Sequence, residues 1–259
     1  MRLIGRVILV VIALAGTARA AQPSIWLLHL NGIGGERRID HTLVDGLVQG
    51  GLDAQTNIYD WTGPDTGLAA LTVTKRHQEE SAKVAEMIEK EFRADPDRPI
   101  VLTGHSAGAG IAAYALEKLP DDVVIETLLM LQPALSPGYD LSKALRHVHG
   151  KAYAFTSLGD VIVLSAGTKM FGTVDGIKTD AAGRVGFEIP ETADKFEYAK
   201  LMQIPYRPEW VRFGNTGEHI GPMRRAFARE VIAPLLLTGK LPPTPATAPT
   251  TQPADARPQ

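Results

Sequence analysis

The sequence predicts an α/β fold, in which helices cover both faces of a mainly parallel central sheet. Short aliphatic runs alternate along the chain with longer segments of helical periodicity. Most of the short runs are apolar at consecutive positions, which is typical of strands that are buried on both faces of a parallel sheet. No internal repeat interrupts the order of the elements, so one layered domain is expected.

The composition sets bounds on what the protein does. With 259 residues, the chain is long enough for one large domain with a substantial core. Its formal net charge is −2, and no basic run or basic stripe suggests binding to nucleic acid. It contains no cysteine, which excludes a disulfide framework, a thiol nucleophile, a thiolate zinc site and a lipoprotein anchor.

Residues 1–20 have the composition of a signal peptide. Arg2 and Arg6 form a basic start, residues 7–15 are apolar, and Ala18-Arg19-Ala20 is a small-residue cleavage site. The apolar stretch is too short to cross a bilayer comfortably. We therefore expect cleavage near Ala21, a secreted or periplasmic protein, and no stable membrane anchor after cleavage.

The remaining chain divides into a folded part and a tail. Residues 21–240 are expected to form one domain, since they contain all the predicted strands and helices. Residues 241–259 are rich in Pro, Thr and Ala and have no apolar periodicity. Such a segment cannot bury enough surface to offset its ordering entropy, so we expect a disordered tail.

The elements of the first half follow from apolar runs and from periodicity. An apolar stripe at helical spacing, such as Val84, Met87 and Ile88, predicts an amphipathic helix, whereas continuous runs predict strands. In chain order we predict a strand over 24–30, a helix over 39–49, a strand over 55–61, a helix over 75–92, a strand starting at 100 and a helix over 109–119.

The second half is predicted in the same way. Its closing helix has a proline in the first turn, and one long segment is rich in Gly and Thr and is interpreted as a loop. In chain order we predict a strand over 126–131, a helix over 141–148, a strand over 152–156, the loop over 161–182, a strand or hairpin arm over 184–189, a strand over 209–213 and the closing helix over 222–237.

The stretch Gly104-His105-Ser106-Ala107-Gly108 joins a predicted buried strand to a predicted helix. A serine on such a turn forms a nucleophile elbow, because the small residues around it let strand and helix approach closely. Ser106 is therefore the predicted nucleophile, and the N–H of Ala107 would point at a developing oxyanion. The five-residue pattern alone also arises by chance, so the strand and helix around it carry the prediction.

A serine nucleophile needs a base that takes its proton and a third group that orients the base. His219 is the predicted base, since it lies in a glycine-bounded loop between the last predicted strand and the closing helix. His105 is the weaker alternative, because a side chain at its place in the elbow normally points away from the reacting carbonyl. His29, His41 and His77 are interpreted as structural or solvated. His147 and His149 flank a predicted helix end, where a cation suits the helix macrodipole.

The orienting acid should lie between the serine and the histidine in sequence, at the carboxyl end of a strand. Asp160 meets both conditions, because it follows the predicted strand over 152–156. An aspartate in Leu-Gly-Asp is also common in turns, so the interpretation of Asp160 as a turn residue stays open. Asp175 is the alternative acid, and Asp140 is better explained as the cap of a helix.

The glycine-rich loop Gly32-Ile33-Gly34-Gly35 follows the first predicted strand. Glycines let the backbone come close to a substrate oxygen, so the loop would supply the second half of an oxyanion hole at Gly32 and Ile33, most directly through the N–H of Ile33. The other interpretation is an ordinary turn. A dinucleotide-binding fingerprint is excluded, since Arg37 stands where it needs a glycine.

With this elbow, this loop and the order Ser106, Asp160 and His219, the chain over 24–237 resembles the α/β-hydrolase superfamily. The resemblance implies about eight strands, an active site at their carboxyl ends and no cofactor; no metal site is predicted either. In many lipase- and esterase-like members the loop reads His-Gly-x-Gly-Gly. Here Asn31 replaces that histidine, so the oxyanion hole would be supported differently.

The resulting expectation is a serine hydrolase that cleaves carboxylic esters through an acyl-enzyme, with a small-molecule or lipid ester as substrate. Amide and thioester hydrolysis remain open, because one fold carries many chemistries. The alternative from another class is a catalytically inactive protein of this fold that binds a partner at the cell envelope.

Overall fold

The computed structural model describes residues 24–64, 67–160 and 172–243, and it confirms the predicted α/β architecture. Six strands in these ranges form one sheet in the order β2-β1-β3-β4-β5-β6, and every neighbouring pair is parallel. The predicted sheet had about eight strands. The strands are β1 (Ile25–Leu30), β2 (Ala54–Tyr59), β3 (Ile100–His105), β4 (Ile125–Leu131), β5 (Val148–Thr156) and β6 (Leu201–Pro205).

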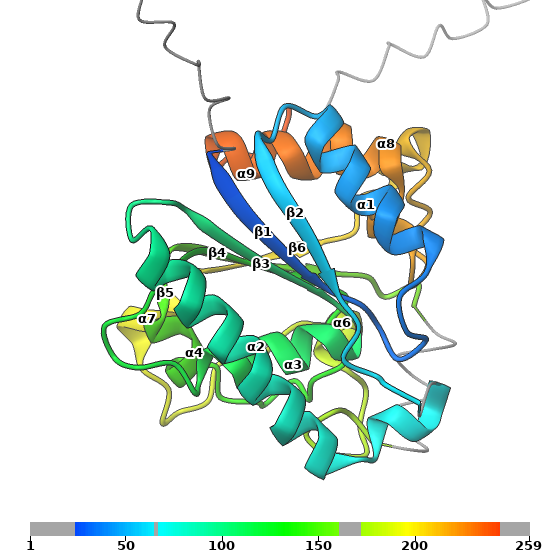
Figure 1. Cartoon of the computed structure of the whole chain (residues 1–259). Helices are drawn as coiled ribbons and strands as arrows, with labels where there is room; N and C mark the ends of the chain where they lie inside the picture. The colour runs from blue at the N-terminus through cyan, green and yellow to red at the C-terminus, as the bar shows by residue number, and fades with distance from the viewer. Residues whose placement is uncertain (1–23, 65–66, 161–171, 244–259) are drawn as a thin grey trace, which may run out of the picture.

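Helices cover both faces of this sheet (Figure 1). On one face lie α1 (Arg38–Gln49) and the C-terminal elements η4 (Gly221–Met223), α8 (Arg225–Phe227), η5 (Ala228–Ile232) and α9 (Ala233–Thr238). On the other face lie α2 (Thr74–Ala94), α3 (Ala107–Leu116), α4 (Ser142–Arg146), α6 (Ala182–Val185) and α7 (Lys195–Tyr198). Two single-turn elements complete the set, η1 (Gly67–Leu71) and η3 (Pro208–Phe213).

The sheet separates two hydrophobic cores, because successive residues of a strand point to opposite faces. Leu102 of β3 lies in the core shared with α2 and α3, whereas Val101 lies in the core under α1 and the C-terminal helices. In β1, Leu28 and Leu27 divide in the same way. Burial on both faces explains why these strands read as continuous apolar runs in the sequence.

Helix α1 packs against the C-terminal helices without room for a side chain at two positions. A Cβ added to Gly46 would lie 2.5 Å from the carbonyl oxygen of Arg225, and one added to Gly50 would lie 2.4 Å from Cβ of Ala233. Glycine inside a helix costs about 1 kcal/mol relative to alanine. The close approach therefore depends on residues that the isolated helix would disfavour.

The predicted closing helix over 222–237 starts three residues later than predicted and contains a π-turn. Residues 221–223 form the 3-10 element η4 and Arg224 is extended, after which α8, η5 and α9 follow one another without a break from Arg225 to Thr238. Pro234 lies just after this turn. It lacks the N–H that would bond to residue 230, and its ring would collide with that carbonyl in a regular α-helix, so the wider π-turn removes the conflict.

Two predicted strands are not strands. The segment 209–213 belongs to the 3-10 helix η3, which Pro208 starts and Gly214, with φ 79°, ends. The segment 184–189 contains the end of α6 and a turn at Gly186 with φ 92°. Conversely, the sequence analysis missed β6, a five-residue edge strand that pairs with β5. It is short and half exposed, so it has no continuous apolar run to reveal it.

The ends of the chain and half of the predicted loop over 161–182 lie outside the described residues. These are the predicted signal peptide over 1–20, residues 161–171 and most of the predicted tail. Leu241 is described and packs against the core under α1, so the packed part of the chain extends past residue 240. No helix in the described ranges combines the length and hydrophobicity that crossing a membrane would require.

Candidate active site

Ser106 lies on a strained turn between β3 and α3. Its φ of 56° and ψ of −121° are unusual for a residue other than glycine, and such strain persists only where the surrounding structure enforces it. Three backbone hydrogen bonds do so here. The Ser106 N–H donates to the carbonyl of Leu131 at 2.9 Å, and its own carbonyl accepts from the N–H groups of Ala109 and Ala134.

The two glycines of the elbow are required by space. A Cβ on Gly104 would lie 2.5 Å from the backbone nitrogen of Ala109, and one on Gly108 would lie 2.4 Å from the carbonyl oxygens of Leu30 and Asn31. Contacts below 3.0 Å between a Cβ and backbone atoms force the chain to move. Gly104 thus allows α3 to start against β3, and Gly108 allows α3 to pass the end of β1.

The structure brings Asp160 and His219 together. Asp160 follows the end of β5, and its carboxylate Oδ2 accepts a hydrogen bond from Nδ1 of His219 at 2.5 Å. The side chain of Asp160 is 2% exposed and that of His219 is 14% exposed, so the pair is shielded from water on the acid side. Because Nδ1 is bonded to the carboxylate, Nε2 is the nitrogen of His219 that remains for a reacting group.

His219 is held beside the elbow by the residue that precedes the serine. His105 Nε2 donates to the carbonyl oxygen of His219 at 2.9 Å, and the centres of the two rings are 4.7 Å apart. Ser106 and His219 form no hydrogen bond within the described part of the chain. Catalytic hydrogen bonds often tighten only when substrate is bound, and rotation of a serine side chain is a small movement.

The glycine-rich loop after β1 lies against the elbow. A Cβ on Gly32 would stand 3.5 Å from Cβ of Ser106, which is an ordinary contact distance, so the loop lies directly beside the serine. The carbonyl of Ile33 accepts a hydrogen bond from the N–H of Gly67 at 2.6 Å. Within the described ranges, the N–H groups of Ile33 and Ala107 have no acceptor, and both belong to segments that adjoin Ser106.

Asp60, which the sequence analysis did not single out, fixes this loop. One carboxylate oxygen accepts from the N–H of Glu36 at 3.0 Å, and the other accepts from Thr62 and from the side-chain amide of Asn31. Burial raises the pKa of Asp60, but these hydrogen bonds outweigh burial and hold it below its usual value. The backbone carbonyl oxygen of Asn31 also accepts a hydrogen bond from Trp61 Nε1 at 2.6 Å. The predicted strand over 55–61 included Asp60, whereas β2 ends at Tyr59, so the misplaced strand end hid this residue from the sequence analysis.

The alternative acid, Asp175, is engaged elsewhere. Its carboxylate accepts from the backbone N–H of Ser136 at 2.9 Å and from the hydroxyl of the same serine. These bonds fasten the segment around Asp175 to the loop after β4. Asp140 lies one residue before Leu141, which is the N-cap of α4, and accepts from the N–H of Ser142, so it is held at the helix start but is not the cap that was predicted.

The five other histidines each have a hydrogen-bond or ion-pair partner away from Ser106. His41 and His149 are exposed and pair with Glu36 and Glu126, whereas His77 and His147 are buried and bond to the carbonyls of Ala70 and Val123. His29 is fully buried in β1, and its Nε2 lies 2.9 Å from Oδ1 of Asp40. Burial raises the pKa of Asp40, but the hydrogen bond to His29 and its charge lower it overall.

No group of three or more histidine or carboxylate side chains in the described ranges is arranged to hold a metal ion.

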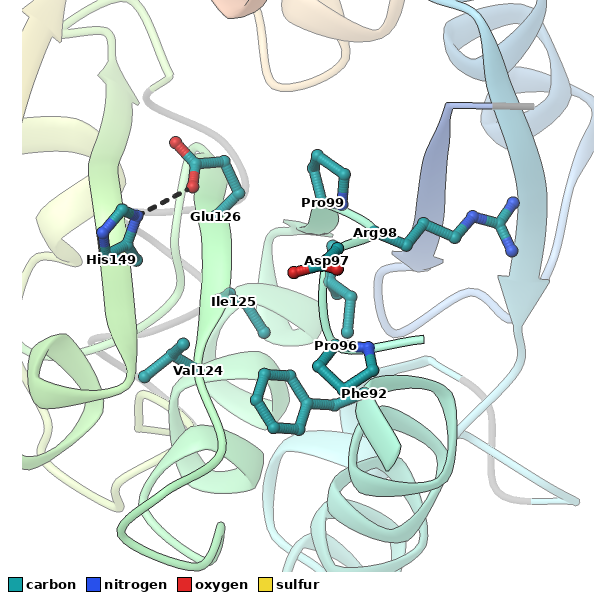
Figure 2. A pocket seen from close by; sticks show the side chains of 10 residues that line it. Phe92, Pro96, Asp97, Arg98, Pro99, Val124, Ile125, Glu126 and His149 are labelled. Carbon is teal, nitrogen blue, oxygen red and sulfur yellow. Dashed lines mark hydrogen bonds and ion pairs between the residues drawn. The ribbon is translucent and has the colours of Figure 1, made fainter. Parts of the chain in front are cut away.

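A hollow of about 380 Å³ opens at the amino ends of the strands, where β3, β4 and β5 begin (Figure 2). Pro99, Ile125 and the ion pair of Glu126 with His149 line it. Since parallel strands run from these amino ends to the elbow, the hollow is separated from Ser106 by the length of β3.

Neither a protein-family model nor a curated protein sequence matches the chain. Solved structures resemble it. Lipase B of Aspergillus fumigatus is 12% identical, with 83% of this chain and 53% of the lipase aligned at a TM-score of 0.51. Est1E of Butyrivibrio proteoclasticus is 13% identical, with 85% and 90% aligned at 0.48. Trichoderma reesei cutinase is 14% identical, with 49% and 61% aligned at 0.39. The chain thus spans about half of the lipase, and the likeness to it shows a common fold.

Proposed function

We propose that this chain, which has the α/β-hydrolase fold, is a serine hydrolase that cleaves carboxylic esters through an acyl-enzyme. The observation that carries the proposal is the bonded pair of Asp160 and His219, held at a strained elbow that presents Ser106. A strained serine costs stability, and such strain is concentrated at functional sites. The pair next to it supplies the base and the orienting acid that a hydroxyl nucleophile needs.

In the proposed reaction, Ser106 Oγ attacks the ester carbonyl while His219 Nε2 takes its proton. The tetrahedral intermediate then collapses, the bond to the alcohol oxygen breaks, and the proton on His219 passes to the leaving alcohol. Water repeats both steps on the acyl-enzyme, which releases the carboxylic acid and restores Ser106. Asp160 holds the imidazole in the required tautomer and stabilises the imidazolium that forms in each step.

The oxyanion of each intermediate would be bound by the N–H groups of Ala107 and Ile33. Two features support this assignment: neither group has an acceptor in the described ranges, and Gly32 brings the loop against Ser106. Loss of one such donor typically costs about a hundredfold to a thousandfold in rate. Asp60 and Asn31 would keep the loop in place before substrate arrives.

The substrate class is proposed as a small-molecule or lipid ester. One solved structure of the same fold with a TM-score above 0.5 is named a lipase, which supports an ester over an amide or a thioester. We further propose that the enzyme acts in the periplasm or outside the cell. That part rests only on the signal-like sequence of residues 1–20.

The test is covalent labelling by a fluorophosphonate, which reacts with activated serines. The wild-type protein should gain one label on Ser106, and Ser106→Ala should remain folded, unlabelled and at least about a thousandfold less active toward esters. Ser136→Ala is the matched control, because this serine is also buried but bonds to Asp175. A folded wild-type protein that neither takes the label nor cleaves esters of graded acyl length would favour the inactive binding protein.

A further inference from the structure

Three consecutive carbonyl oxygens in the loop that carries His219 each accept a hydrogen bond from a buried side chain. Ser157 Oγ donates to the carbonyl of Gly217 at 2.6 Å, and Gln132 Nε2 donates to that of Glu218 at 3.2 Å. The third bond runs from His105 Nε2 to the carbonyl of His219 itself at 2.9 Å. These bonds hold the backbone of the loop at three successive positions, the last of which is His219 itself.

The three donors come from the carboxyl ends of three neighbouring strands. His105 is the last residue of β3, Gln132 directly follows β4, and Ser157 directly follows β5. The loop therefore crosses the ends of the strands, and each strand contributes one donor to it. Asp160 follows β5 three residues after Ser157, so the acid and one of the donors belong to the same short segment.

The backbone conformation of Gln132 is unusual. Within the described ranges, only Ser106 and Gln132 have a positive φ without being glycine, and the φ of Gln132 is 47°. Its N–H donates to the carbonyl of Phe155 at 3.0 Å, which helps to hold this conformation. Glutamine is a poor choice for a left-handed position, and its presence there suggests that its side chain is needed.

All three donor side chains are removed from water. His105 is 2% exposed, Gln132 is 1% exposed and Ser157 is 4% exposed. Buried polar side chains cost free energy unless they are bonded, so each one is committed to the loop. Gln132 Oε1 has no partner among the described residues, which leaves the bond to Glu218 as the interaction that its side-chain amide makes.

We propose that His105, Gln132 and Ser157 are positioning residues, which fix the loop backbone and thereby aim Nε2 of His219 at Ser106. The inference rests on the proposed function, because it concerns the base of that reaction. His105 also touches the opposite wall of the site, since a Cβ on Gly32 would lie 3.1 Å from its Nδ1. One buried imidazole therefore spaces the base from the glycine-rich loop.

His105 donates this bond through a protonated Nε2, and in the folded protein it does so as a neutral imidazole. Burial and the nearby His219 lower the pKa of His105 to about 3, partly opposed by its bond to the carbonyl and by the charge of Asp40. At any pH where His219 acts as a base, His105 is therefore an uncharged donor. Its ionisation does not appear in the rate profile near neutral pH.

The experiment compares variants that remove each donor with variants that keep it. His105→Phe, Gln132→Gly and Ser157→Ala remove a donor, whereas His105→Gln and Ser157→Thr retain one at a similar reach. Gln132→Gly also relieves the positive φ, so its backbone should be no less stable. Thr103→Val is the matched control, since this buried hydroxyl on β3 has no partner among the described residues.

For the variants that lack a donor we expect kcat to fall about 10-fold to 100-fold, with KM changed less than about twofold, because misplacement by about 1 Å acts on the transition state. His105→Gln and Ser157→Thr should recover most of that loss. In proton NMR spectra, the downfield Nδ1 proton of His219 should broaden or shift only where a donor is missing. Thr103→Val should leave both readouts unchanged.

The outcomes separate this inference from the proposed function. If the wild-type protein takes no fluorophosphonate label and cleaves no ester, the proposed function fails, and the inference fails with it. If the wild-type protein is active but the folded Gln132→Gly and Ser157→Ala variants keep its kcat and its Nδ1 signal, only the positioning role is overturned. Equal loss in His105→Phe and His105→Gln would overturn the role of the donated bond at that residue.

Discussion

Two histidine–aspartate pairs lie near the same edge of the sheet, and they differ in the nitrogen that the carboxylate holds. In the pair at the elbow, Asp160 bonds to Nδ1 of His219, whose side chain is 14% exposed. In the other pair, Asp40 bonds to Nε2 of His29, which is completely buried, and Nδ1 of His29 has no partner among the described residues.

The difference teaches that the pairing of a histidine with an acid does not by itself make a catalytic base. The nitrogen opposite the acid must also reach a substrate. His29 is completely buried, so neither of its nitrogens is open to a substrate, whereas Nε2 of the partly exposed His219 is not bonded to the acid. The pair of His29 and Asp40 ties the end of β1 to the start of α1, and the pair of His219 and Asp160 leaves one nitrogen of the histidine for chemistry.

The largest expected difference between the two pairs appears when each histidine is replaced in turn. His219→Ala should lower kcat/KM at least about a thousandfold with little change in the free energy of unfolding. His29→Ala leaves the buried Asp40 without its partner, so it should cost about 3 kcal/mol of stability while the folded protein keeps its activity. Steady-state kinetics and urea unfolding measure both quantities. The comparison fails if His29→Ala remains stable but inactive.

Replacing the acids gives a smaller contrast. Asp160→Asn should lower kcat about a hundredfold or more, since the amide favours the wrong tautomer of His219 and cannot stabilise an imidazolium. Asp40→Asn should instead lower stability by about 1 to 2 kcal/mol through weaker hydrogen bonds. Asp175→Asn is the control for position in sequence and should change kcat by less than about twofold. A larger loss in Asp175→Asn would move the acid to that residue.

The pH dependence of stability sharpens the comparison at His105, which lies next to His219 and also senses Asp40. In the unfolded chain this imidazole takes up a proton near pH 6.5, but in the folded protein its pKa is about 3. The contribution of His105 to the free energy of unfolding is therefore fully present above about pH 6.5 and declines as the pH falls. Between about pH 7.5 and pH 5 the loss is about 2 kcal/mol.

His105→Gln should remove this part of the pH dependence, whereas Thr103→Val should retain it. Urea unfolding at the two pH values measures the difference for each variant. His77 is also buried with a lowered pKa and contributes in the same direction in all variants, so only the difference between them is informative. An identical pH dependence in His105→Gln and the wild-type protein would contradict the assignment.

The smallest expected effect concerns the end of the chain. Residues 244–259 have a composition that cannot form a packed face, so their removal should change neither Tm nor kcat/KM beyond error. The truncation must keep Leu241, which packs against the core. Removal from residue 241 onward is the matched comparison and should lower Tm slightly. A drop of several degrees after removal of residues 244–259 alone would show that the tail packs on the domain.

The sequence predicted the features that depend on local rules. The elbow was predictable because Gly104 and Gly108 occupy fixed positions around Ser106 at a strand-to-helix turn. Asp160 was predictable as a candidate because it follows β5 at the carboxyl ends of the strands. His219 was predictable because it lies in a glycine-bounded loop before the C-terminal helix, although the strand predicted before that loop is the 3-10 helix η3. The pairing of Asp160 with His219 at 2.5 Å supports both choices together.

Other features left no pattern in the sequence. The edge strand β6 is short and half exposed. The element η3 resembles a strand because Trp210, Val211 and Phe213 are strand-favouring residues, but Trp210 and Phe213 pack against the core and Val211 is exposed. Trp210 packs on Phe155 and Phe227, with ring centres 6.0 Å and 5.0 Å away. The donors to the His219 loop depend on how separate strands end in space, which no spacing along the chain encodes.

The close packing of α1 on the C-terminal helices has a consequence for how the protein is made. Thr42 bonds to Met223 and Asp45 to Arg225, over separations of 181 and 180 residues. While the ribosome is still translating the middle of the chain, α1 has no surface on which to bury Gly46 and Gly50. Contacts of such long range slow folding and delay it until synthesis is nearly complete. A nascent chain therefore keeps α1 unpacked until the C-terminal helices have been made.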